Sequence, residues 1–122
     1  MKKILIIDDS SFQRKIISSI LQEAGYTLVV TDNGRDGFAA IEKERPDLVI
    51  TDLLMPEFDG FYFLEQAKAH GIPVPVLILT SDIQDTTRAK CLSLGAARVI
   101  NKPVKKEVLL AAVASVFAGE QA

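Results

Sequence analysis

The sequence predicts an α/β domain in which five parallel strands alternate with five helices. Five short runs rich in Val, Ile and Leu recur at nearly even spacing, and segments with helical periodicity separate them. Several of these runs are apolar at successive positions, which is typical of strands covered on both faces. Strands that alternate with helices in this way form a doubly wound parallel sheet with right-handed crossovers and helices on both faces.

The expected strands are short and end in polar residues. They cover Ile4–Ile7, Leu28–Thr31, Leu48–Thr51, Val76–Thr80 and Arg98–Asn101. The runs that begin at Ile4, Leu48 and Val76 are continuously apolar, so we expect them in the middle of the sheet.

The first expected helix begins after Ser10, which forms a capping-box pattern with Gln13. Gly25 provides its stop. Apolar residues at helical spacing give this helix one inward face, made of Phe12, Ile16, Ile17, Ile20, Leu21 and Ala24.

The next two helices have clear start signals. Asn33 and Gly34 open the second helix, which ends before Pro46. Asp59 and Gly60 open the third helix, which closes at Gly71. Its expected inward residues are Phe61, Leu64 and Ala67.

The last two helices complete the alternation. Either Ser81 or Asp82 can cap the fourth helix, which closes at Gly95. The fifth helix is expected from Val104 to Phe117, and its expected inward residues are Val108, Leu109, Ala112, Val113 and Val116.

The composition argues against several classes of protein. A net charge of -2 gives no reason to expect direct binding to nucleic acid or to an anionic membrane. No stretch approaches the roughly 20 apolar residues of a membrane span. The apolar run after Lys3 stops at Asp8, which makes it shorter than the roughly 7–15 residues of an export signal. We therefore expect one cytoplasmic domain over residues 1–122, and the start at Met1 favours a stand-alone protein.

Polar side chains lie at the ends of four of the expected strands. Asp8 and Asp9 follow the first strand, Asp52 follows the third, Thr80 closes the fourth and Lys102 follows the fifth. The carboxyl ends of parallel strands share one edge of the sheet, where ligands bind in open α/β folds. A single aspartate before a helix is usually a cap, but capping does not explain the convergence of the whole set.

This set of residues suits a divalent cation and a phosphoryl group. Carboxylates held close together repel one another unless a cation lies among them, and a few hard oxygen ligands suit Mg²⁺. Asp8, Asp9 and Asp52 supply three negative charges, which Mg²⁺ and Lys102 balance. A carboxylate beside Mg²⁺ and a lysine can act as the nucleophile on a phosphoryl group, and Thr80 can donate its hydroxyl to a phosphoryl oxygen.

Four motifs resemble the receiver domain of two-component response regulators, of the chemotaxis-receiver type. They are "IIDDS", "DLLMPEFDG", "LTS" and "NKP", and they match in order and spacing over essentially the whole chain. The resemblance implies a flavodoxin-like (βα)5 fold whose strand order is 2-1-3-4-5.

The resemblance also implies a role for each residue of the set. Asp52 is the phosphoacceptor, and Mg²⁺ is held by Asp8, Asp9, Asp52 and the backbone carbonyl of Leu54. Thr80 is the switch hydroxyl, and Lys102 pairs with the phosphoryl group. The Lys102–Pro103 bond is expected to be cis, and Leu54 and Asp82 are expected to tune the lifetime of the phosphorylated state.

Two partners follow from the resemblance. One is a sensor histidine kinase or a phosphotransfer protein, and the other is a downstream protein bound by the fourth helix, the fifth strand and the fifth helix. Basic residues cluster around the last two helices and form either ordinary surface charge or a face for an acidic partner. They are Arg88, Lys90, Arg98, Lys105 and Lys106.

Two other functions are compatible with an acidic magnesium site. Phosphohydrolases of the haloacid-dehalogenase type carry a second aspartate two residues after the nucleophile, but this chain has Leu54 there, which cannot transfer a proton. An unphosphorylated receiver could serve only as an interaction module, and the intact set of five residues argues against it. We expect a phosphorylation-dependent signalling switch and not an enzyme.

One position departs from the family pattern. Receivers usually carry Tyr or Phe three residues before the lysine, and that ring turns inward when the switch hydroxyl moves. This chain has Val99, which is short and stiff at its first torsion. Two accounts remain open. Either the chain signals through the loop after Thr80 and the start of the fourth helix, so that the response centres on residues 81–88 while Val99 keeps its rotamer, or it is a phosphate sink with little conformational output.

Overall fold

The computed structural model describes residues 2–119, and within them strands and helices alternate from end to end. The strands are β1 (Lys3–Ile7), β2 (Thr27–Thr31), β3 (Leu48–Asp52), β4 (Val76–Thr80) and β5 (Arg98–Asn101). The helices are α1 (Ser11–Glu23), α2 (Gly34–Glu44), α3 (Gly60–Ala69), α4 (Asp85–Ser93) and α5 (Lys106–Phe117). Met1 and residues 120–122, which the predicted domain includes, lie outside the described residues.

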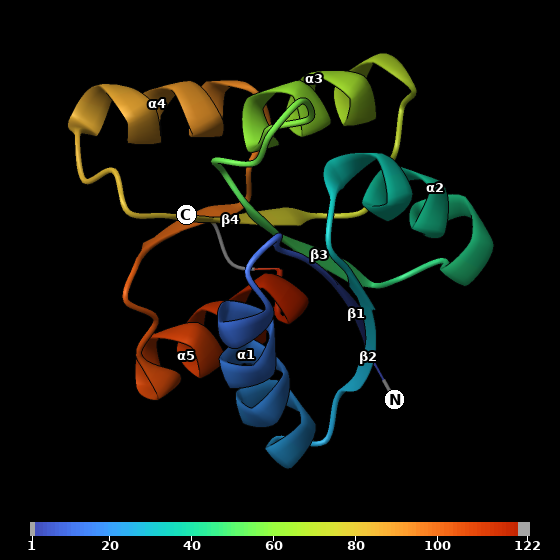
Figure 1. The fold of residues 1–122 in the computed structure, drawn as a ribbon, viewed down its shortest axis with the longest axis vertical. Helices are drawn as coiled ribbons and strands as arrows, with labels where there is room; N and C mark the ends of the chain where they lie inside the picture. Colours follow the sequence, from blue (N-terminus) through green and yellow to red (C-terminus); the bar gives the residue numbers. More distant parts are fainter. Residues whose placement is uncertain (1, 120–122) are drawn as a thin grey trace.

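The strands form one parallel sheet in the order β2-β1-β3-β4-β5, which confirms the predicted topology (Figure 1). The chain first moves from β1 outward to β2 and then returns to place β3 on the other side of β1. The direction of winding therefore reverses between β1 and β3. In an open α/β sheet, this reversal leaves a crevice at the carboxyl ends of the two strands.

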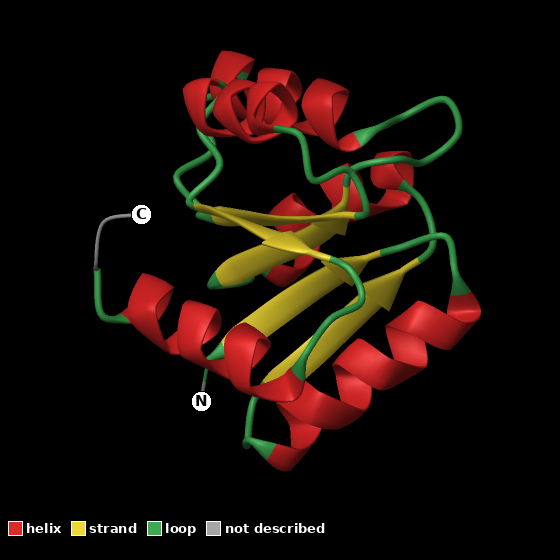
Figure 2. Ribbon diagram, turned by 90° about the vertical axis from the view of Figure 1, so that its left-hand side faces the viewer, coloured by secondary structure: helices red, strands yellow, loops and turns green. Residues whose placement is uncertain are grey.

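Helices cover both faces of the sheet (Figures 1 and 2). Alternate residues of β1 show the two layers, because Ile4 and Ile6 belong to the core under α1 and α5. Leu5 and Ile7 belong to the core on the opposite face, where Phe63 of α3 is fully buried. Burial on both faces explains why β1, β3 and β4 are apolar without alternation.

The helices are 9 to 13 residues long. In the described part of the chain, none is both long and apolar enough to cross a bilayer. Three of the predicted N-caps are confirmed: Ser10 accepts from the amide of Gln13 at 3.3 Å, and Asn33 and Asp59 make equivalent bonds to the third residue of α2 and α3.

The start of α4 differs from the prediction. Its N-cap is Gln84, which makes no side-chain capping bond, so neither Ser81 nor Asp82 is the N-cap. Asp82 instead lies two residues earlier and uses its carboxylate to accept from the amide of Gln84 and the hydroxyl of Thr87. The prediction was wrong because the connection from β4 is longer than a minimal loop, and Asp82 stabilises that loop together with the first turn.

The predicted inward faces of α1 and α5 were partly wrong. Phe12 is 69% exposed and Val108 is 48% exposed, and Ala24 at the end of α1 is also exposed. Ile17 and Leu109, by contrast, are fully buried. Apolar periodicity therefore identifies only part of the buried face, because Val108 and Leu109 are adjacent residues of the same turn of α5. In α3, Leu64 and Ala67 are buried as predicted, Phe61 is half-buried and the unpredicted Phe63 is fully buried.

Two phenylalanines test this assignment of buried and exposed positions. Phe63→Ala should lower the free energy of unfolding by about 3–5 kcal/mol, because it opens a cavity in the core under α2 to α4. Phe12→Ala removes the same atoms from a solvent-exposed site and should change it by less than about 0.5 kcal/mol. Urea unfolding followed by circular dichroism measures both values. Equal losses in the two variants would contradict the assignment of Phe63 to the core.

Candidate acidic metal site

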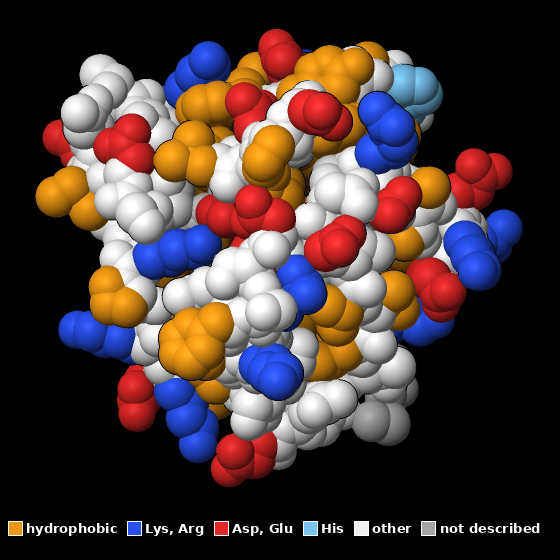
Figure 3. Space-filling model, viewed as in Figure 1, with side chains coloured by type: hydrophobic (Ala, Val, Ile, Leu, Met, Phe, Trp, Pro, Cys, Tyr) orange, Lys and Arg blue, Asp and Glu red, His pale blue; other side chains and the backbone are white. Residues whose placement is uncertain are grey.

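Three carboxylates meet at the edge where the direction of winding reverses. Ile7 of β1 pairs with Thr51 of β3, so the residues that follow them, Asp8 and Asp52, lie side by side at the strand ends. With Asp9, they place carboxylate oxygens within 4.8 Å of one another. Asp8 is fully buried, Asp52 is nearly so and Asp9 is exposed. Acidic side chains accordingly gather near the centre of this face of the molecule (Figure 3).

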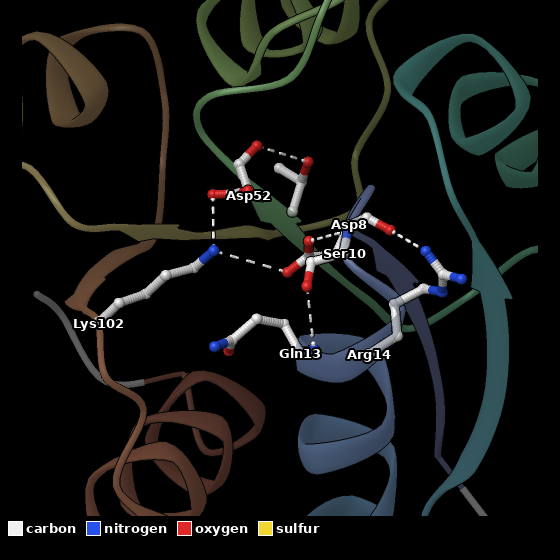
Figure 4. Close-up of polar contacts among 7 residues, drawn as sticks. Asp8, Ser10, Gln13, Arg14, Asp52 and Lys102 are labelled. Atoms are coloured by element: carbon white, nitrogen blue, oxygen red, sulfur yellow. Dashed lines mark hydrogen bonds and ion pairs between the residues drawn. The ribbon is translucent and has the colours of Figure 1, made fainter.

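Backbone and side-chain donors fix the position of Asp8 (Figure 4). The amide of Ser10 donates to Asp8 Oδ1 at 2.9 Å, and Arg14 Nη1 donates to the Asp8 carbonyl at 2.6 Å. Sequence reasoning missed both contacts. The first had a signal, because an aspartate just before a helix commonly accepts from the amide two residues later. Nothing in the sequence pattern distinguishes Arg14 from an ordinary surface arginine.

Lys102 lies between the two buried carboxylates (Figure 4). Its Nζ is 3.1 Å from Asp52 Oδ1 and 3.7 Å from Asp8 Oδ2. The backbone amide of Lys102 donates to the carbonyl of Thr80 at 2.8 Å, which joins the ends of β4 and β5. The Lys102–Pro103 peptide bond is cis, as the resemblance implies.

The electrostatics of Asp52 are set mainly by burial. Removal from water raises the pKa of its carboxyl group above the ordinary value, because the charged form loses hydration. The Lys102 ammonium opposes this shift through charge and hydrogen bonding, and the carboxylates of Asp8 and Asp9 add to it by repulsion. The ionised site therefore carries more negative charge than Lys102 alone balances.

The site fits a divalent cation. Asp8 Oδ2 is buried and has no hydrogen-bond partner among the described residues, and Lys102 Nζ at 3.7 Å is too distant to provide one. A buried carboxylate oxygen without a partner is costly, and a cation would satisfy it. The available donors are hard carboxylate oxygens, which suit Mg²⁺ better than the softer metals that prefer sulfur or imidazole.

The remaining predicted site residues lie at the same edge but make different contacts. Thr80 ends β4, beside β3, and its buried hydroxyl accepts from the amide of Asp82 at 3.0 Å. Leu54 follows β3 by two residues, and its side chain is 64% exposed. Asp52 itself ends β3, where Thr51 Oγ1 donates to its carbonyl at 3.1 Å. The nucleophile candidate is thus held on a strand, whereas the Thr80 hydroxyl is engaged with a loop.

Comparison with known proteins agrees with this fold and site. A family model described as the response regulator receiver domain matches residues 4–114. The protein PilH of Pseudomonas aeruginosa is 35% identical over 121 residues, which cover 98% of this chain and all of PilH. The structure of the chemotaxis protein CheY4 of Vibrio cholerae superimposes with a TM-score of 0.89 at 32% identity, covering 95% of this chain and 98% of CheY4.

Other relatives are longer proteins. A protein-glutamate methylesterase/protein-glutamine glutaminase of Treponema pallidum is 37% identical over 108 residues, and the match spans only 27% of its length. The chain belongs to the response regulator receiver domain family. It is a two-component signalling domain with an acidic pocket, and a receiver domain is not in itself a catalytic enzyme.

The raised pKa of Asp52 gives a stability prediction for the metal-free protein. The folded state holds the Asp52 proton more tightly than the unfolded chain, so stability falls as the pH rises through the ordinary and then the raised pKa. In EDTA at pH 7, Asp52→Asn should therefore have a higher Tm than the native chain. The difference should shrink at pH 3, where the carboxyl group is protonated in both states.

Magnesium provides the control for this measurement. A cation that binds only the folded state stabilises it, so Mg²⁺ should raise the Tm of the native chain much more than that of Asp52→Asn. If Asp52→Asn were less stable than the native chain in EDTA at pH 7, the attribution of the shift to burial and carboxylate repulsion would be wrong.

Proposed function

We propose that this chain is a phosphorylation-dependent switch that accepts a phosphoryl group on Asp52 from a phosphohistidine kinase or a phosphotransfer protein. The observation that carries the proposal is the meeting of Asp8, Asp9 and Asp52 around a buried carboxylate oxygen that has no hydrogen-bond partner among the described residues, with Lys102 in contact with Asp52. We further propose that the chain acts in the cytoplasm as a single receiver domain over residues 1–122.

The proposed chemistry is an in-line displacement at phosphorus. An oxygen of Asp52 attacks, the bond from phosphorus to the donor imidazole nitrogen breaks, and its electron pair leaves with the imidazole. Asp8, Asp9, Asp52 and the carbonyl of Leu54 would hold Mg²⁺, which when bound neutralises charge on the transferring oxygens. The Lys102 ammonium, already 3.1 Å from Asp52, is placed to pair with a phosphoryl oxygen.

Thr80 is proposed as the residue that senses the product. A hydroxyl carries one donor and two acceptor positions, and the bond from Asp82 uses only an acceptor position. The hydroxyl proton can therefore be donated to a phosphoryl oxygen once the side chain turns toward it. The alternative of a phosphohydrolase lacks support at this edge. Leu54 occupies the position where such an enzyme needs a general acid–base, and its apolar side chain cannot transfer a proton.

The surface over α4, β5 and α5 is the proposed site for a downstream protein. A groove of about 410 Å³ runs there, lined by Arg88, Val99, Ile100, Asn101, Lys102, Pro103, Lys105 and Val108. The exposure of Val108, which the sequence placed inward, gives this groove an apolar wall. We propose that a protein and not nucleic acid binds there, because the net charge of -2 offers no general attraction for a polyanion.

The structure divides the basic residues of this region into two groups. Arg88 and Lys105 line the groove. The others make contacts elsewhere: Lys90 Nζ lies 4.1 Å from the centre of the Phe61 ring, Lys106 Nζ is 3.6 Å from Glu23, and Arg98 donates to the hydroxyl of Ser115. Charge complementarity to an acidic partner would therefore rest on Arg88 and Lys105, since Lys102, which also lines the groove, is paired with Asp52.

Phosphorylation by a small-molecule donor tests the proposed chemistry. With Mg²⁺ and acetyl phosphate, the chain should gain one phosphoryl group, detected by intact-mass spectrometry at neutral pH. Asp52→Asn and the addition of EDTA should each abolish the gain, whereas Asp32→Asn, at an exposed aspartate outside the site, should retain it. Labelling that persists in Asp52→Asn would rule out Asp52 as the acceptor, and no labelling of the native chain would favour an unphosphorylated interaction module.

The lifetime of the phosphorylated state gives a second test. Leu54 is exposed beside the site and cannot orient an attacking water, so we expect slow self-hydrolysis. Leu54→Asn should increase the rate about fivefold, since one neutral hydrogen bond is worth about 1 kcal/mol. Leu54→Ala is the control for the loss of the side chain alone, and an equal increase in both variants would contradict water positioning by the amide.

A further inference from the structure

Hydrogen bonds connect the site to α4 through one loop residue. The hydroxyl of Thr80 accepts from the amide of Asp82 at 3.0 Å. The carboxylate of Asp82 then accepts from the amide of Gln84 at 2.9 Å and from Thr87 Oγ1 at 2.6 Å. Asp82 therefore binds the end of β4 with its backbone and the first turn of α4 with its side chain.

A second contact continues from α4 to β5. Arg88, the residue after Thr87, donates from Nη1 to the carbonyl of Val99 at 3.0 Å. The side chain of Val99 is buried in the core that includes Cys91 of α4. The position that the family usually fills with an aromatic ring thus holds a buried valine here, and a guanidinium contacts its backbone.

We propose that Asp82, Thr87 and Arg88 are the positioning residues that couple occupancy of the acidic site to α4 and β5 in this chain. The inference rests on the proposed function, because it takes the phosphoryl group on Asp52 as the input. In the resting state, Asp82 binds the hydroxyl of Thr80 through its backbone amide and Thr87 in the first turn of α4 through its carboxylate. In the occupied state, the hydroxyl turns toward the phosphoryl group and the Asp82 amide loses its acceptor.

The bonds on Asp82 make this a two-state element. The bonds from Thr87 and Gln84 favour the ionised form of the Asp82 carboxyl group and lower its pKa, and an ionised carboxylate is a strong acceptor. When the Thr80 hydroxyl turns away, the Asp82 backbone has to move to find another acceptor, because an unpaired amide is unfavourable. The same movement draws the Asp82 carboxylate away from Thr87, so the first turn of α4 is released from the loop. A conformational response requires contacts that differ between two states, and these are such contacts.

The coupling makes an unusual prediction for Thr87→Val. This substitution is nearly isosteric and removes only the hydroxyl donor, which is used in the resting state. Loss of a bond made only in the resting state shifts the population toward the occupied-like state. The apparent Kd for beryllofluoride with Mg²⁺, a mimic of the phosphoryl group, should therefore fall by about two- to tenfold, the range expected for one hydrogen bond. A structural defect would weaken binding instead.

Matched variants control for helix propensity and packing. Thr86→Val makes the same substitution at the exposed neighbouring position and should keep the native affinity. Thr87→Ser retains a hydroxyl donor and should restore the native affinity. In the free protein, ¹H–¹⁵N spectra of Thr87→Val should show amides 81–88 shifted part of the way toward their beryllofluoride-bound positions. If Thr87→Val and Thr86→Val had equal affinities and equal spectra, the proposed role of the bond between Thr87 and Asp82 would be overturned.

The contact from Arg88 has its own readout. The carbonyl of Val99 shares a peptide group with the amide of Ile100, so a change in the bond from Arg88 should shift the Ile100 resonance when beryllofluoride binds. Arg88→Met keeps most of the stem but removes the donors, and should abolish the Ile100 shift while leaving the shifts of residues 81–87 in place. An Ile100 shift of native size in Arg88→Met would show that the bond from Arg88 to Val99 does not transmit the change from α4 to β5.

The experiment separates this inference from the function on which it rests. If the native chain binds beryllofluoride and Asp52→Asn does not, the acidic site works as proposed, and the Thr87 and Arg88 variants then decide the coupling alone. If the native chain fails to bind beryllofluoride in the presence of Mg²⁺, both the proposed function and the coupling are overturned.

Discussion

The repulsion among Asp8, Asp9 and Asp52 is the constraint on which the rest of the structure depends. Two of these carboxylates are buried at the ends of adjacent parallel strands, and a single ammonium, that of Lys102, lies between them. Such an arrangement persists only if the backbone holds it in place. The continuous core on both faces of β1 and β3 provides that support, and the bonds to Asp8 from Ser10 and Arg14 complete it. The cost of the repulsion is what makes the site receptive to a cation and to a phosphoryl group.

The sequence predicted most of the fold because the signals that define it are local. Continuous apolar runs identified the buried strands, and Ser10, Asn33 and Asp59 identified three helix starts. The errors fell where periodicity no longer reports burial. Phe12 and Val108 continue the apolar pattern of their helices, yet both side chains are exposed. The start of α4 was misplaced because a polar loop contained two residues able to cap, and only tertiary structure decides how long such a loop is.

The candidate site was predictable to a similar degree. Topology alone brings residues at the ends of parallel strands to one edge, which is why Asp8, Asp52 and Lys102 could be expected to meet. The bond from the Ser10 amide to Asp8 had a sequence signal, but the other contacts that orient these residues depend on loop torsions that no residue pattern encodes. The guanidinium of Arg14 and the clamp of Asp82 on Thr87 became visible only in the structure.

The placement of Asp52 on a strand has a consequence for how such a chain diversifies. Its neighbours fix the backbone on both sides, since Thr51 donates to the Asp52 carbonyl and the amide of Leu53 donates to Leu79 at 2.9 Å. Under the proposed function, the acceptor is rigid and preorganised, so transfer requires little reorganisation of the protein. The groups proposed to respond lie instead on the exposed loop after β4. Substitutions in that loop can therefore change which partner reads the signal without moving the acceptor, and they alter the affinity for the phosphoryl group only through the proposed coupling.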